Sequence, residues 1–291
     1  MSNLPAVRTY HWLQSSVVQN VGDYAGTLVL KQMGFQAVTR YAHHSRIINP
    51  GRCLLPIGSV LYDRTFHNIP EPVDVWGCGW RGTALHPDFA LRVTFHAVRG
   101  PQTIEGLGLP PNTPLGDPAL LLPHLSTIAP KHHGRTLVMP HYFRTYALSA
   151  RQRCLSTGCA MMVPSRIIGR PAQGRRPSPR GLGSMVRGFL ALGIPIYSGT
   201  QAIHIIAGAG FILTGSLHGA IFAQAYGVPW AAYDDGYIDV PAKWLDWAAY
   251  LGIRLDFVKD LREGQHWWQV EGRHGKVREL ESLLGAFPYP V

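Results

Sequence analysis

The chain has 291 residues, of which 46% are hydrophobic and 15% charged, a balance typical of a folded globular protein of one or two domains. No apolar run reaches the roughly 18 residues of a membrane-spanning helix, and the first residues lack the apolar stretch of a signal peptide, so we expect a cytoplasmic protein. The four cysteines show no CxxC spacing, which argues against a zinc site or a disulfide framework.

The net charge of +10 is unevenly distributed. Residues 118–233 contain eleven Lys or Arg and no Asp or Glu, whereas the charges of the remaining residues nearly cancel. Such a block predicts an anionic partner, although a basic solvated surface has the same composition. We do not expect nucleic acid, because the sequence carries no helix-turn-helix, zinc-finger or RNA-binding-sheet signature. A small, highly charged metabolite fits the charge equally well.

In the first half, short apolar runs alternate with glycine-containing turns and helical patterns, which is typical of an α/β fold. The patterns predict helices over 24–33 and 102–107, and strands over 6–14, 36–42, 54–61, 73–77 and 89–99. Asp117 precedes Pro118, which predicts an N-cap followed by proline at the first helical position.

The polar segment 125–134 predicts a boundary between an N-terminal domain, 1–130, and a C-terminal domain, 131–291. Beyond it we expect strands over 136–142 and 193–199 and helices over 201–208, 241–252 and, closing the chain, 278–284. Residues 165–187 are rich in Pro, Gly and Arg and are predicted to be a mobile loop. Three roles stay open for this loop: folding over an anionic donor, contact with an anionic membrane surface, or neither.

Residues 211–237 form the central pattern of the sequence, around which the other predicted elements are arranged. A buried strand over 211–213 leads through a turn with two glycines into a helix over 220–226, which Gly227 ends, and then into a strand over 228–232. A helix N-terminus at the carboxyl end of a parallel strand is suited to bind an anion. His218 lies at that position, where a helix-capping or packing role is the alternative.

Eight short motifs carry a family resemblance between about residues 15 and 255. They are Asn20-Val21-Gly22-Asp23, Val75-Trp76-Gly77-Cys78-Gly79, Val98-Arg99-Gly100-Pro101-Gln102-Thr103, the run from Leu115 to Leu122, Val138-Met139-Pro140-His141-Tyr142, Ser216-Leu217-His218-Gly219-Ala220, Gly227-Val228-Pro229-Trp230 and Lys243-Trp244-Leu245-Asp246-Trp247. In this order they resemble the polysaccharide pyruvyl transferases, most closely the exopolysaccharide ketal-pyruvate branch.

The resemblance implies two Rossmann-like domains that face a central cleft in a glycosyltransferase B-like arrangement. It also implies an enzyme of exopolysaccharide biosynthesis that uses phosphoenolpyruvate as donor substrate. The sequence shows no metal-binding cluster, so we expect no required metal and no further cofactor. The enolpyruvyl unit would be moved onto a sugar of a polysaccharide or lipid-linked precursor as a cyclic ketal, and phosphate would leave. A lipid-linked acceptor would bring the protein to the inner face of the membrane.

The resemblance also assigns roles to residues. His218 is expected to be the general acid, and Asp23 to orient the acceptor or act as base. Donor binding is assigned to Arg99, Ser216, Leu217, Gly219, His141 and Arg144, and acceptor binding to Asn20, Gly22 and Gly79. Many family members carry arginine where this chain has Ser216, so either Arg144 or the pair Arg175-Arg176 supplies that charge, or the donor differs. A metal-independent nucleotide-sugar glycosyltransferase and a non-catalytic polyanion-binding protein are the alternatives.

Overall fold

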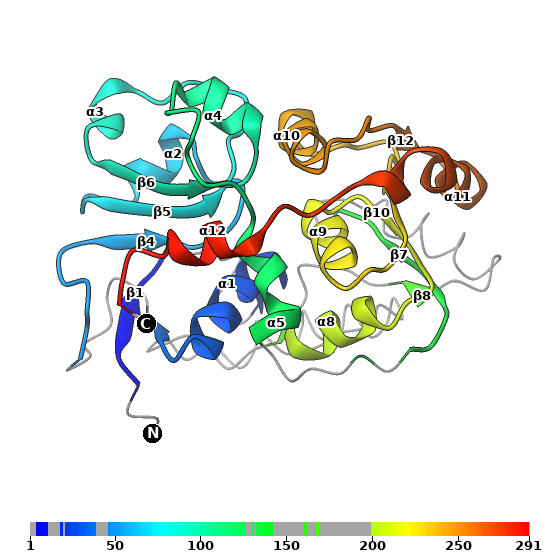
Figure 1. Cartoon of the computed structure of the whole chain (residues 1–291), viewed down its shortest axis with the longest axis horizontal. Coiled ribbons are helices and arrows are strands. Elements are labelled where there is room, and N and C mark those ends of the chain that lie inside the picture. The colour runs from blue at the N-terminus through cyan, green and yellow to red at the C-terminus, as the bar shows by residue number, and fades with distance from the viewer. Residues whose placement is uncertain are drawn as a thin grey trace, which may run out of the picture.

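The structure is a computed structural model that describes residues 4–10, 18–19, 21–38, 46–125, 130, 132–141, 160–161, 167–168 and 199–290. It is a mixed α/β fold built on parallel sheets, which confirms the predicted class at that level (Figure 1). The predicted strand over 193–199 and the arginine-rich loop lie wholly or almost wholly outside the described residues, as do Asn20 and Arg144. Within the described residues, every helix is too short or too polar to cross a bilayer.

The first half is built on parallel strands: β1 (Ala6–Arg8), β3 (Gln36–Val38), β4 (Cys53–Leu55), β5 (Val73–Cys78) and β6 (Val93–Val98). β1 pairs with β3, and β5 lies between β4 and β6. A single parallel bridge between Thr9 and Leu54 connects these two groups. Every residue of β5 is buried, because the strand is covered on both faces.

The helices of this half are α1 (Val21–Gln32), α2 (Asp63–His67), α3 (Pro87–Ala90), α4 (Pro101–Leu107), the 3₁₀ helix η1 (Pro118–Leu121) and α5 (Leu122–Leu125). The strand predicted to start at Phe89 starts only at Val93. His86 accepts a hydrogen bond from the Asp88 N–H, and Pro87 occupies the first helical position, so this segment forms a helical turn instead.

The second half contains a parallel five-stranded sheet in the order β12-β11-β10-β7-β8. Its strands are β7 (Thr136–Met139), β8 (Ala160–Met161), β10 (Phe211–Thr214), β11 (Trp230–Tyr233) and β12 (Phe257–Val258). The helices are α8 (Gly199–Ala207), α9 (Leu217–Ala225), α10 (Pro241–Leu251), α11 (Leu261–Val270), η2 (Gly272–His274) and α12 (Leu280–Gly285). A short antiparallel pair joins β2 (Val18–Gln19) to β9 (Ile167–Ile168).

The turn between β10 and α9 is tighter than the sequence predicts. The Thr214 hydroxyl accepts a hydrogen bond from the Ser216 N–H at 3.0 Å and donates one to the Ser216 carbonyl at 2.7 Å. This local bonding lets α9 begin at Leu217, three residues earlier than expected. Gly227, in the left-handed region at φ 68°, follows the helix as predicted.

The C-terminal segment crosses back onto the first half (Figure 1). The indole N–H of Trp76 donates to the Leu283 carbonyl at 2.8 Å, and the Tyr289 hydroxyl donates to Asp74 at 2.8 Å. The predicted closing helix is therefore present, but it packs against the first half rather than closing the second. A continuous cluster of buried apolar side chains includes residues of both halves, from Trp76 to Trp230. Two separate Rossmann-like domains divided near residue 130 stay a prediction.

Candidate functional site

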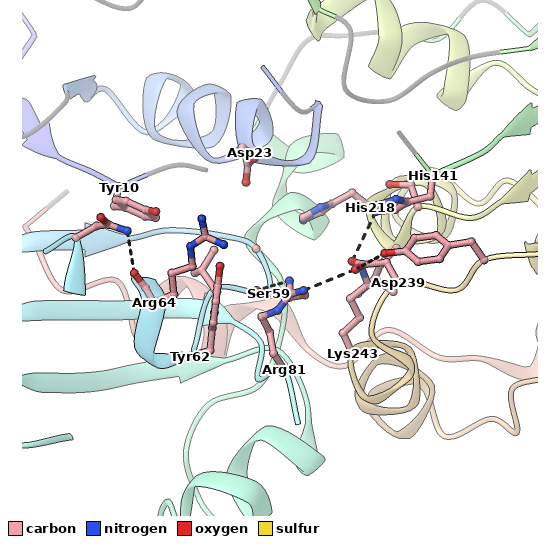
Figure 2. A pocket seen from close by; sticks show the side chains of 16 residues that line it. Tyr10, Asp23, Ser59, Tyr62, Arg64, Arg81, His141, His218, Asp239 and Lys243 are labelled. Atoms are coloured by element: carbon pink, nitrogen blue, oxygen red, sulfur yellow. Dashed lines mark hydrogen bonds and ion pairs between the residues drawn. The ribbon is translucent and has the colours of Figure 1, made fainter. Parts of the chain in front are cut away.

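A pocket of about 750 Å³ lies where the carboxyl ends of strands from both halves meet. The first half contributes loops after β1, β4 and β5 together with α1 and α2, and the second half contributes residues that follow β7, β10 and β11. Figure 2 shows their side chains converging on one space, with Asp23 on one side, His218 and His141 on another, and Arg81 opposite Asp23. The lining side chains with titratable groups are Tyr10, Asp23, Tyr62, Arg64, Arg81, His141, His218, Tyr237, Asp239 and Lys243.

The N-terminus of α9 forms part of the pocket wall through Ser216, Leu217 and His218. Ser216 is the N-cap residue, but its side chain makes no capping hydrogen bond. The N–H groups of the first helical turn have no acceptor within the helix, and the helix dipole adds partial positive charge there. The predicted helix N-terminus at the carboxyl end of a parallel strand is therefore present, and it lines the pocket.

His218 is supported from behind by Asp117. The imidazole Nε2 lies 3.6 Å from Asp117 Oδ2, and the Asp117 side chain is fully buried. The other carboxylate oxygen accepts the Ala119 N–H at 3.0 Å, which confirms the predicted N-cap. Among the described residues, neither His218 Nε2 nor Asp117 Oδ2 has a hydrogen-bond partner. A small rotation would join them and fix which ring edge faces the pocket.

Helix α1 approaches His218 at Gly22, where the missing side chain makes room for the imidazole. A Cβ at this position would overlap the His218 ring. The next residue, Asp23, points into the pocket and is only 6% exposed. Burial raises the pKa of Asp23 well above its usual value, because water no longer stabilises the charged form. Asp23 is therefore a carboxyl group suited to take part in proton transfer.

The predicted donor ligand Arg99 does not line the pocket. Its side chain is fully buried, with Nε 3.5 Å from Asp246 Oδ2 and Nη1 donating to the Ser59 hydroxyl at 2.7 Å. Ser59 itself lines the pocket, so Arg99 acts from behind it. Gly79 packs against the same guanidinium, with no room for a Cβ. The strand-end position was predicted correctly, but the side chain turns into the protein.

Asp246 of α10 ties the two halves together behind the pocket. Its carboxylate accepts the Thr103 N–H at 2.9 Å and the Thr103 hydroxyl at 2.8 Å. Thr103 lies in the first turn of α4, so an acidic side chain from the second half caps a helix of the first. A Cβ at Gly100, the N-cap position of α4, would overlap Asp246.

A cluster of charged groups forms the remaining wall. Lys243 Nζ pairs with Asp239 Oδ2, His141 Nε2 lies 3.6 Å from the same oxygen, and Arg81 Nη2 lies 3.6 Å from Oδ1. The Tyr237 hydroxyl donates to Oδ1 at 3.3 Å. Burial alone would raise the pKa of Asp239, but the neighbouring His141 and the charge and hydrogen bond of Lys243 lower it below the usual range. Burial lowers the pKa of Lys243 to about 8, although Asp239 opposes that shift.

The structure brings five of the predicted site residues into one pocket: Asp23, His141, Ser216, Leu217 and His218. Gly219 lies beneath the helix against Thr214 and Met139, where it permits close packing on the sheet. The sequence reasoning missed the charged and aromatic side chains Tyr10, Tyr62, Arg64, Arg81, Tyr237, Asp239 and Lys243. Lys243 is the first residue of the motif Lys243-Trp244-Leu245-Asp246-Trp247, and its place in that motif is a signal that could have identified it.

The described part of the chain contains no group of three or more His, Cys, Asp or Glu side chains placed to hold a metal ion. The charged cluster around Asp239 contains one carboxylate among several cations, so its chemistry favours anions over metal cations.

Comparison with known proteins gives one distant relative. The succinoglycan biosynthesis protein ExoV of Rhizobium meliloti (strain 1021) is 26% identical over 210 residues, which cover 72% of this chain and 56% of that protein. The chain therefore spans little more than half the length of the curated relative it matches. No family model matches the chain.

Two solved structures show weak overall likeness. An uncharacterised protein of Klebsiella pneumoniae superimposes with a TM-score of 0.49 at 14% identity, covering 89% of this chain and 100% of that one. A Listeria monocytogenes protein provisionally assigned as a UDP-N-acetylglucosamine 2-epimerase gives a TM-score of 0.41 at 11% identity, covering 94% and 90%.

Proposed function

We propose that the protein is a pyruvyl transferase that uses phosphoenolpyruvate to place a cyclic pyruvate ketal on a sugar of a polysaccharide or lipid-linked precursor. The observation that carries the proposal is the composition of the pocket. A helix N-terminus, two histidines, Lys243 and two arginines face the same space as a buried carboxyl group of raised pKa. The distant similarity to a succinoglycan biosynthesis protein supports a saccharide acceptor.

The donor places definite demands on the site. Phosphoenolpyruvate carries a carboxylate and a phosphate, and such groups bind to cations and to helix N-termini. The N-terminus of α9 and the cations Arg81 and Lys243 lie on the same pocket and can hold two anionic groups of one small molecule. Arg99, to which the family resemblance assigned this task, would act indirectly by holding Ser59 at the pocket wall.

The reaction balances without a redox step. Two sugar hydroxyls form two C–O bonds to C2 of the enolpyruvyl unit, the bond from C2 to the phosphate oxygen breaks, and the methylene carbon gains a proton to become methyl. One hydroxyl proton replaces the proton given to the methylene carbon, and the other leaves with phosphate. We assign proton donation to His218, backed by Asp117, and proton removal from a sugar hydroxyl to Asp23.

The acceptor fits best at the end of the pocket that the first half forms. Tyr10, Tyr62 and Arg64 line that end, on the side of Asp23 away from His141 (Figure 2). Aromatic rings offer an apolar face for a sugar ring, while a tyrosine hydroxyl and a guanidinium can bond its hydroxyls.

The proposal is tested with labelled phosphoenolpyruvate. We expect the protein to transfer label from phosphoenolpyruvate to an oligosaccharide acceptor in an acid-labile linkage, with one phosphate released for each label transferred. His218→Ala should lower this rate at least about a hundredfold, the usual contribution of a general acid. His204→Ala is the matched control, because His204 lies on α8 and does not line the pocket.

Ligand stabilisation gives a second, acceptor-free measurement. A ligand that binds only the folded state stabilises it by about 2.7 kcal/mol at 100 times its Kd. We expect millimolar phosphoenolpyruvate to raise the unfolding temperature, and UDP-sugars to leave it unchanged. The opposite result, a shift with UDP-sugars alone, would replace pyruvyl transfer by glycosyl transfer.

A further inference from the structure

The cations around Asp239 outnumber the negative charge that they surround. Arg81 and Lys243 each carry one positive charge, and His141 adds another when it is protonated, against the single carboxylate of Asp239. The side chains of Lys243 and His141 are only 8% and 7% exposed, so solvent does little to neutralise the surplus. A buried surplus of charge is costly unless a counterion binds.

The geometry around the Asp239 carboxylate is that of an anion-binding site. Its two oxygens face Lys243, His141, Arg81 and the hydroxyl of Tyr237, all of which line the pocket. Figure 2 shows Arg81 approaching Asp239 from the first half of the chain, and His141 and Lys243 approaching it from the second. A carboxylate that is hydrogen-bonded by a lysine, with an arginine and a histidine 3.6 Å away, lies where a phosphate group could meet the same cations.

The backbone beside Asp239 is strained. Val240 has φ 46°, in the left-handed region, and it is the single non-glycine residue with positive φ among the residues that the structure describes. For a β-branched side chain this conformation is a genuine outlier, and such strain persists only where surrounding contacts impose it. Asp239 directly precedes Val240, so the ion pairs of Asp239 are contacts that can hold this backbone in place.

We propose that Asp239 is an internal counterion that occupies a phosphate subsite formed by Arg81, His141 and Lys243, and that an incoming phosphate group displaces it. This proposal rests on the proposed function in one respect: the phosphate is that of the donor before transfer and the released phosphate afterwards. A dianionic phosphate neutralises the cationic surplus that one carboxylate leaves. Displacement of Asp239 would also release the backbone strain at Val240, and this release would lower the free-energy cost of the displacement.

The competition between Asp239 and phosphate predicts the direction in which phosphate affinity changes when Asp239 is replaced. A ligand must displace Asp239 before it binds, so its apparent Kd equals the intrinsic Kd divided by the fraction of molecules in which the subsite is open. We expect Asp239→Asn to bind inorganic phosphate about tenfold more tightly than the wild type, in titration calorimetry at fixed pH and ionic strength. Asp234→Asn is the control: it removes the same charge from the same loop outside the pocket, and should leave the affinity unchanged.

A second variant tests the strain and does not depend on Asp239→Asn folding. Val240→Gly accepts the left-handed conformation without strain and so stabilises the closed subsite. We expect it to bind phosphate about threefold more weakly, a change opposite in sign to that of Asp239→Asn. Unchanged or weaker binding by Asp239→Asn, or tighter binding by Val240→Gly, would overturn the proposal.

These outcomes separate the subsite from the proposed function. If Asp239→Asn gains phosphate affinity but no pyruvyl transfer is found, the subsite stands and the proposed reaction falls. If label transfer is found and Asp239→Asn shows no gain, the reaction stands and the subsite falls.

Discussion

Removal of the Asp246 carboxylate should cost more stability than almost any other single change in this chain. Asp246 is fully buried and bonds both the N–H and the hydroxyl of Thr103, besides pairing with the fully buried Arg99. Asp246→Ala removes the carboxylate that pairs with the Arg99 guanidinium. It also leaves the N–H and the hydroxyl of Thr103 without their acceptor. Loss of one partner from a buried ion pair costs about 3–5 kcal/mol, so we expect a loss of about 4 kcal/mol.

Urea denaturation followed by tryptophan fluorescence measures this loss directly. Asp256→Ala is the matched control, because Asp256 is 51% exposed and pairs with an Arg254 that is 74% exposed. We expect the control to lose less than about 1 kcal/mol, as exposed ion pairs contribute little.

A double variant separates the orphaned charge from the lost hydrogen bonds. In Asp246→Leu with Arg99→Met, both charges are replaced by apolar side chains, and we expect roughly half of the lost stability to return. The reasoning would be refuted by a loss below about 1 kcal/mol for Asp246→Ala, or by a double variant that shows no recovery.

Two further predictions concern the pocket. Gly22→Ala should lower the transfer rate at least about tenfold without lowering the unfolding temperature, since alanine suits a helix but its Cβ displaces the His218 ring; a rate equal to the wild type would show that this contact is unimportant. Phosphate affinity should fall as the pH rises through about 8, where Lys243 loses its proton in the free protein, by at most about tenfold per pH unit. Lys243→Arg keeps its charge throughout, so its affinity should stay flat from about pH 7.5 to 9.5; a decline equal to that of the wild type would assign the titration to another group.

The pattern of the sequence was sufficient for the strand–turn–helix unit at His218. A continuous apolar run predicts a buried strand, and the glycine-containing turn with Gly227 downstream limits the helix to one short segment. These preferences are local and act within about a dozen residues, so they can be predicted from the sequence without knowledge of the fold. The same holds for Asp117, whose capping role follows from the proline after it.

Tertiary structure alone decided which side chains meet. Arg99 and Lys243 both stand in recognisable motifs, yet Arg99 turns inward because Asp246 of the other half binds it, whereas Lys243 faces the pocket. The cluster at Asp239 joins three segments that are far apart in the chain, and the return of the C-terminus onto Trp76 depends on packing between halves. Local sequence determines which segments form strands and helices, but long-range burial and charge pairing determine where each side chain points.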